Sequence, residues 1–111
     1  MESNYLLVVT TTDSRRDADI LAQALVEKRL AACAQVEGPI TSTYWWQGKL
    51  ENGEEWKCSF KTTAALYTEL ETELSQIHPY DTPEILAFPI IHGSREYLSW
   101  MDEQLRQPGV C

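Results

Sequence analysis

Near its N-terminus the chain carries an unbroken run of four branched apolar residues, Leu6 to Val9, inside the segment 5–12. A strand with one solvated face alternates apolar and polar residues, whereas a strand buried on both faces stays apolar throughout. The run therefore predicts a central strand, and the other elements have to supply its neighbours in the sheet. With 111 residues, the chain has room for one core, and we predict a single domain over residues 1–111.

The rest of the chain alternates between helical and strand periodicities. Asp13 or Ser14 can cap a helix that runs to about Leu30, and Pro79 stops a second helix by His78. The predicted elements, in chain order, are strand 5–12, helix 14–30, strand 33–36, hairpin strands 41–47 and 56–63, helix 66–77, strand 85–91 and a last helix from residue 94. This order predicts an α+β fold, a ferredoxin-like βαββαβ sandwich with an additional C-terminal helix, in which two helices cover one face of a four-stranded antiparallel sheet.

Asn52-Gly53 is a strong signal for a two-residue hairpin turn. In that register Trp46 lies opposite Ser59 and Tyr44 lies opposite Lys61, unless a bulge shifts the pairing. Side chains alternate between the two faces of a strand. One face is then predicted to carry Tyr44, Trp46, Glu55, Lys57 and Lys61, and the other to carry Trp45, Trp56, Cys58 and Phe60.

The predicted sheet has helices on one face only, which leaves its other face open. The hairpin is longer than the other strands and carries Trp45, Trp46 and Trp56 outward. Large exposed apolar surfaces mark interfaces between proteins. Another copy of the same chain is the simplest cover, so we expect a homo-oligomer.

Charge and cysteine usage narrow the classes of partner and location. The formal net charge of −8 argues against nucleic acid, whose backbone requires clustered Lys and Arg. No run approaches the roughly 18 apolar residues of a membrane span, and the N-terminus lacks the pattern of a secretory signal. The three cysteines include no Cys-x-x-Cys pair, so neither a zinc clip nor a disulfide framework is indicated and we expect a cytoplasmic location.

The stretch His78–Glu84 concentrates reactive side chains around two prolines, Pro79 and Pro83, that restrict its backbone. Such a rigid connector could be a catalytic corner, a ligand-binding wall or only a well-made turn. His78 and Asp81 could form a base and its orienting group, but no nucleophile, oxyanion-hole motif or Gly-rich phosphate loop accompanies them. We therefore predict that the protein is not an enzyme.

Several segments resemble the CutA divalent-cation tolerance family, in order and over nearly the whole chain. The two most specific are Tyr44-Trp45-Trp46-Gln47-Gly48-Lys49-Leu50 and the stretch His78 to Leu86. The resemblance implies a role in the response to metal ions. It also implies a ferredoxin-like fold assembled as a homotrimer similar to the PII signalling proteins, with the long hairpins pairing across subunits. We predict no required cofactor.

The metal ligands that the resemblance implies for bacterial members are a Cys in the first strand and two adjacent His before the Pro-Tyr. At these positions this chain has Thr10, Ile77 and His78, so only His78 matches. With Asp81 or Glu84, His78 is a candidate ligand for Cu(II) or another divalent cation. The alternative is that His78 caps the preceding helix and forms local hydrogen bonds.

A second hypothesis places a small ligand at a subunit boundary. An aromatic wall with one cation and one carboxylate suits a small zwitterion or anion, as in a PII-like signalling module. The alternative is that the same residues only hold the trimer together. The predicted ligand-binding residues are Tyr44, Trp46, Glu55 and Lys61 on the hairpin, and His78, Tyr80 and Glu84 on the opposite wall.

Overall fold

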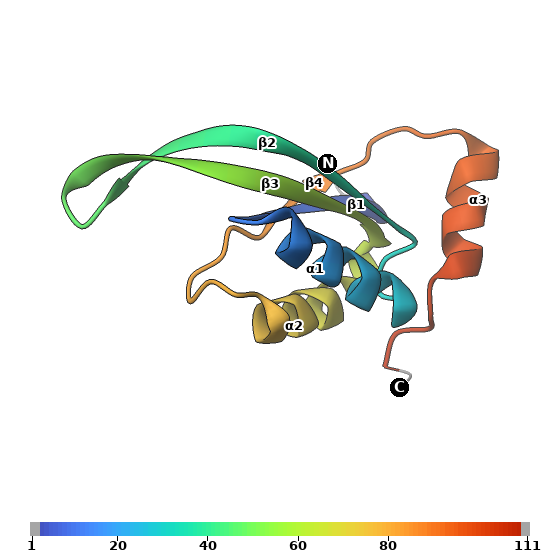
Figure 1. Cartoon of the computed structure of the whole chain (residues 1–111). Coiled ribbons are helices and arrows are strands. Elements are labelled where there is room, and N and C mark those ends of the chain that lie inside the picture. The colour runs from blue at the N-terminus through green and yellow to red at the C-terminus, as the bar shows by residue number, and fades with distance from the viewer. Residues whose placement is uncertain (1–2, 110–111) are drawn as a thin grey trace.

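The computed structural model describes residues 3–109 of the chain. Within that range the strands and helices follow one another in the predicted order, with a short 3-10 turn, η1, before the second helix. Their bounds are β1 Tyr5–Thr12, α1 Arg15–Glu27, β2 Cys33–Trp46, β3 Lys49–Thr63, η1 Ala64–Leu66, α2 Tyr67–Ile77, β4 Leu86–Pro89 and α3 Arg95–Gln104. The α+β class and the βαββαβ order with an additional C-terminal helix are confirmed (Figure 1).

The strands form one antiparallel sheet in the order β2-β3-β1-β4. Strand β1 is central, as its apolar run predicted, because Val8 pairs with Phe60 of β3 on one side and with Ala87 of β4 on the other. Helices α1 and α2 lie side by side on one face of the sheet, whereas α3 stands at the end of the sheet away from the hairpin tip (Figure 1). Within residues 3–109, no comparable helix layer covers the opposite face of the sheet.

The first helix begins where the sequence predicted and ends earlier. Ser14 is its N-cap, and the Ser14 hydroxyl accepts a hydrogen bond from the backbone N–H of Asp17. The helix ends at Glu27 instead of Leu30, because Arg29 adopts a left-handed conformation with φ of 57°. The backbone N–H of Leu30 then donates to the carbonyl of residue 25. This is the usual way to satisfy carbonyls at a helix end.

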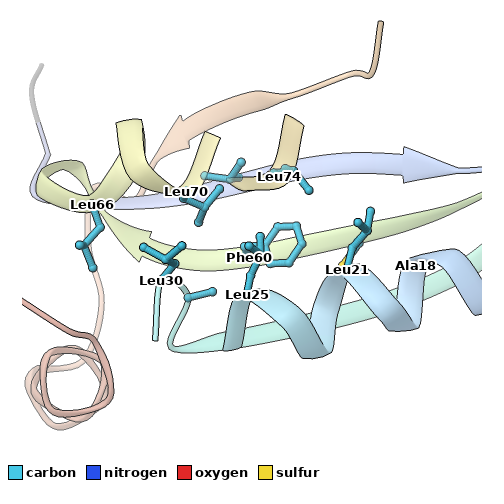
Figure 2. Close-up of a cluster of buried hydrophobic side chains, with 11 residues drawn as sticks. Ala18, Leu21, Leu25, Leu30, Phe60, Leu66, Leu70 and Leu74 are labelled. Carbon is cyan, nitrogen blue, oxygen red and sulfur yellow. The ribbon is translucent and has the colours of Figure 1, made fainter. Parts of the chain in front are cut away.

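The core lies between the helix pair and the covered face of the sheet. Phe60 of β3 is fully buried at its centre, with leucine side chains of both helices directed toward it (Figure 2). The side chains of Cys58 and Thr62, two residues to either side of Phe60, are also buried on this face. The cluster comprises Val8, Ala18, Leu21, Leu25, Leu30, Ala31, Cys58, Phe60, Leu66, Leu70 and Leu74.

The hairpin turn is at Gln47-Gly48, so the predicted turn at Asn52-Gly53 is wrong. Gln47 and Gly48 have φ of 50° and 76°, the positive values that a two-residue hairpin loop requires at both positions. Asn52 and Gly53 lie inside β3, and the hydroxyl of Thr43 donates to the side-chain oxygen of Asn52 at 2.7 Å. A Cβ at Gly53 would lie 3.4 Å from the Tyr44 hydroxyl. Asn52 and Gly53 are therefore ordinary strand residues that contact residues of β2.

The cross-strand pairs change with the turn. Tyr44 lies opposite Glu51 instead of Lys61, and Trp46 lies opposite Lys49. The partner of Tyr44 moves by ten residues along β3, from 61 to 51. An even displacement leaves every side chain on its original face. The predicted faces of the hairpin are therefore correct although the predicted register is not.

The two predicted strands 33–36 and 41–47 are one continuous strand, β2. Its register shifts between Glu37 and Ile40, at Gly38-Pro39. The indole ring of Trp56 packs against this point, where a Cβ on Gly38 would lie 2.8 Å from Trp56 Cδ1. This irregularity lets β2 continue from the body of the sheet into the projecting hairpin.

Strand β4 and helix α3 complete the molecule. β4 is an edge strand that runs from Leu86 to Pro89 and is shorter than the predicted 85–91. Ser94 caps α3 through the backbone N–H of Tyr97. The Tyr5 hydroxyl donates to Asp102 at 2.8 Å and ties α3 to β1. None of the helices in the described range is long and apolar enough to cross a membrane.

Candidate functional site

A groove of about 900 Å³ lies between the base of the β2–β3 hairpin and the loop that follows α2. We call it the hairpin groove. Hydroxyl, aromatic and carboxylate side chains line it, and no Lys, Arg or His is among them. Its lining residues are Thr11, Ser42, Thr43, Tyr44, Trp46, Glu51, Glu55, Tyr80, Asp81, Thr82 and Glu84.

The hairpin wall of the groove follows from the register of β2 and β3. The direct cross-strand partners Tyr44 and Glu51 share a face, and Trp46 and Glu55 lie on that face by alternation. The side chains of Tyr44 and Trp46 are 46% and 59% exposed. The aromatic wall is therefore formed within one chain but not covered by it.

The loop wall is joined to the hairpin wall by one side-chain hydrogen bond. The Tyr80 hydroxyl donates to Glu55 Oε2 at 2.8 Å. Burial, and next this hydrogen bond to the Glu55 carboxylate, raise the pKa of the Tyr80 phenol well above its usual value. Tyr80 therefore stays protonated and holds Glu55 in place on the hairpin wall.

His78 is buried behind the loop wall and does not line the groove. It is the C-cap residue of α2. Its Nδ1 accepts a hydrogen bond from the backbone N–H of Tyr80 at 3.1 Å, and its Nε2 lies 2.9 Å from the hydroxyl oxygen of Thr10 on β1. Burial lowers the pKa of the imidazole and outweighs the opposing effects of the Thr11 backbone, which comes next in size, and of the Asp17 and Glu55 charges. These contacts match the alternative in which His78 caps a helix and bonds locally.

The copper site that the resemblance implies does not fit these residues. Thr10, at the Cys position, touches the His78 ring directly, and both ring nitrogens already have hydrogen-bond partners. Ile77, at the first His position, offers no ligand atom. In residues 3–109 no three side chains of His, Cys, Asp or Glu stand close enough together to hold a metal ion. One chain therefore presents no preformed copper centre in this range.

The structure brings together five of the seven predicted ligand-binding residues. Lys61 lies elsewhere, because its ammonium donates to the Tyr97 hydroxyl at 3.1 Å, next to α3. Lys61 is six positions further along β3 than Glu55, about 20 Å at roughly 3.3 Å per residue. Lys61 was predicted beside Tyr44 only through the wrong register. The hairpin groove of one chain thus lacks the basic side chain that was expected to bind an anionic ligand.

Sequence reasoning missed six residues of the groove. Asp81 was considered only as a partner of His78, and it belongs to the loop wall instead. Glu51 was not considered because the predicted turn placed it beside the loop, whereas it pairs with Tyr44. The others carry hydroxyl groups that no motif distinguishes. The six are Thr11, Ser42, Thr43, Glu51, Asp81 and Thr82.

Comparison with known proteins gives one consistent result. The family model described as CutA1 divalent ion tolerance protein matches residues 6–104. A divalent-cation tolerance protein CutA of Thermus thermophilus is 42% identical over 97 residues, covering 87% of this chain and 94% of the relative. One of Escherichia coli is 40% identical over 104 residues, covering 94% and 92%. The crystal structure of CutA1 from the psychrotrophic bacterium Shewanella sp. SIB1 superposes with a TM-score of 0.92 at 33% identity, covering 96% of this chain and all of that one.

Proposed function

This chain belongs to the CutA1 divalent ion tolerance family, and from that premise we propose that it acts in tolerance to divalent cations by binding them in the hairpin groove. The observation that carries the proposal is the charge of the lining. Four carboxylates, those of Glu51, Glu55, Asp81 and Glu84, line the groove without a basic side chain among them. Such a surface attracts cations and repels anions.

The ligand atoms of the groove favour hard cations. Carboxylate and hydroxyl oxygens suit Mg²⁺, Ca²⁺ and Mn²⁺, whereas copper prefers sites that include imidazole or sulfur. Neither histidine nor cysteine lines the groove. The role that we propose for the groove is the binding of hard cations, with no catalytic step assigned to it.

The proposed site is completed by a neighbouring subunit of a homotrimer. The carboxylates of one chain do not converge to a cluster of three within residues 3–109. The hairpin that forms one wall leaves Trp45 73% exposed and Trp46 59% exposed. The open face of the sheet adds Leu86 and Phe88, each about half exposed. Apolar surface of this kind is typical of interfaces, and a second copy seated on it can supply ligand atoms to the groove.

Calorimetry with Mn(II), and with Cu(II) for comparison, tests the proposal. We expect stoichiometric Mn(II) binding that weakens by about tenfold or more in Glu84→Gln, because a ligand charge is lost while the shape of the side chain is kept. Glu103→Gln, an exposed acid on α3, is the matched control and should leave the affinity unchanged. Equal effects of the two substitutions, or no binding by the wild type, would overturn the proposed site.

A further inference from the structure

We infer that Thr10 and His78 form a buried bridge that positions Tyr80, and through Tyr80 the Glu55 carboxylate, in the hairpin groove. Three contacts in series make up the bridge. Thr10 Oγ1 lies 2.9 Å from His78 Nε2, the Tyr80 backbone N–H donates to His78 Nδ1 at 3.1 Å, and the Tyr80 hydroxyl donates to Glu55 Oε2 at 2.8 Å. His78 and Thr10 are thus positioning residues and touch no ligand.

The partners of His78 determine its tautomer. A backbone N–H can only donate, so Nδ1 of His78 has to be the unprotonated, accepting nitrogen. The neutral imidazole then carries its proton on Nε2, which donates to the Thr10 hydroxyl oxygen. Both ring nitrogens are occupied in this state. His78 consequently serves as a fixed link between two parts of the chain that lie 68 residues apart.

The anchor of the bridge is a buried position in the centre of the sheet. Thr10 is completely buried in β1, the central strand, and it pairs with Cys58 of β3. The loop on the other side of the bridge is more exposed, since Asp81, Thr82 and Glu84 are all exposed. Pro79 allows few backbone conformations between His78 and Tyr80. Fixing the His78 ring against β1 therefore also fixes the direction in which Tyr80 enters the groove.

Two substitutions at Thr10 separate the bridge from simple packing. Thr10→Val removes the hydroxyl and nearly keeps the shape of the side chain, whereas Thr10→Ser keeps the hydroxyl and loses a methyl group. His78→Asn is a further variant, because the Asn side chain can accept the Tyr80 N–H in an Asx turn but cannot span the distance to Thr10. Circular dichroism and thermal melting establish that each variant is folded.

The first readout is nuclear magnetic resonance without any metal. The ring nitrogen shifts of His78 should report the Nε2–H tautomer in the wild type and in Thr10→Ser. In Thr10→Val the Tyr80 N–H still holds Nδ1 unprotonated, but the ring loses its Thr10 partner, so amide exchange at Tyr80 should accelerate by about tenfold, the factor that corresponds to the loss of one net hydrogen bond. Unchanged Tyr80 exchange in Thr10→Val, or an equal change in Thr10→Ser, would overturn the bridge.

The second readout is Mn(II) affinity, and it alone rests on the proposed function. Loss of a group that orients a ligand residue typically weakens metal binding by about 10- to 100-fold. We expect such a loss in Thr10→Val and recovery in Thr10→Ser. If no variant and no wild-type protein binds Mn(II), the proposed cation site fails, and the tautomer and exchange data still decide on the bridge. If Mn(II) binds equally well to both Thr10 variants, the bridge does not position the groove and the inference is wrong.

Discussion

At the scale of single residues, His78 and Cys58 show how burial controls chemistry that the sequence alone leaves open. The His78 imidazole is held at both nitrogens and buried, and burial lowers its pKa. The Cys58 thiol lies on the core face of β3, where burial, followed by the nearby Asp19 charge, raises its pKa to about 12. In each case the neutral form is favoured in the folded protein.

The lowered pKa of His78 predicts a pH dependence of stability. The unfolded chain binds a proton at its ordinary pKa near 6.5, whereas the folded chain binds it only at lower pH. The unfolded state therefore holds more protons in the window below about pH 6.5, and stability falls as the pH drops through it. Urea unfolding at pH 7.5 and 5.5 should show this fall in the wild type and a smaller one in His78→Asn. A parallel loss in both proteins contradicts the assignment.

Cys58 should be inert in the folded protein. Because burial keeps its thiol protonated at pH 8 and the thiolate is the reacting species, iodoacetamide should modify Cys58 only after unfolding. Mass spectrometry of peptides from native and urea-treated samples measures this directly. If iodoacetamide modified Cys58 in the folded protein about as fast as in the unfolded chain, the covered face of the sheet would have to open readily.

At the scale of elements, the β2–β3 hairpin separates what sequence patterns can predict from what they cannot. Gln-Gly and Asn-Gly both offer a glycine for a tight turn, and local preference favours Asn-Gly. Cross-strand contacts place the turn at Gln47-Gly48 instead, because Thr43 pairs with Asn52 and the Tyr44 side chain lies next to Gly53. Such contacts between residues distant in sequence leave no local signal.

The position of the turn can be tested with two equivalent substitutions. Gly48 has a φ of 76° and open space around it, so Gly48→Ala should cost about 1 kcal/mol through backbone strain alone. Gly53 is in an extended strand, where an added methyl group meets the Tyr44 side chain at ordinary contact distance, so Gly53→Ala should cost less. Urea unfolding compares the two. A larger cost at Gly53 would favour the turn at Asn52-Gly53.

The sequence predicted the order of elements, the central place of β1 and the faces of the hairpin, because hydrophobic periodicity is a property of each segment. It predicted Tyr44, Trp46, Glu55, Tyr80 and Glu84 as neighbours, and the groove contains all five. It misplaced Lys61 and overlooked Glu51, both on β3, because the cross-strand partner of each residue depends on the register. The burial of His78 depends on a contact with β1 across 68 residues, which no spacing rule can supply.

At the scale of the whole molecule, the apolar residues left exposed are not spread evenly. Trp45, Trp46 and Leu50 cluster at the hairpin, and Leu86 and Phe88 lie on β4. Ile20 and Val26 of α1, on the helix layer, and Tyr97 and Trp100 of α3 are exposed as well, but Ile20 is the only one of these four that is exposed by half. The uneven distribution is the basis on which we propose a homotrimer in which hairpins and open sheet faces are covered.

The proposed trimer predicts a simple contrast between two sets of substitutions. The double substitution Trp45→Glu and Trp46→Glu should disrupt the interface, because it places two unpaired carboxylates in an apolar contact. Ile20→Glu is the matched control on the helix layer. Light scattering should give three chain masses for the wild type and the control, and a smaller mass for the hairpin variant. A monomeric wild type would refute the proposed assembly, and so would a hairpin variant that stays trimeric.

The hairpin reaches well past the rest of the sheet. The last pair between β1 and β3 joins Thr12 and Trp56, so residues 49–55 of β3 have β2 as their partner and lie beyond the end of β1. Two-stranded ribbons are marginally stable in water on their own. The chain therefore contains two cooperative units of unequal strength. The body unfolds as a whole, whereas the arm can open locally at a much smaller free energy. In the proposed homotrimer, contact with another subunit would lower the population of the opened arm, and we then expect the order of this region to increase with protein concentration.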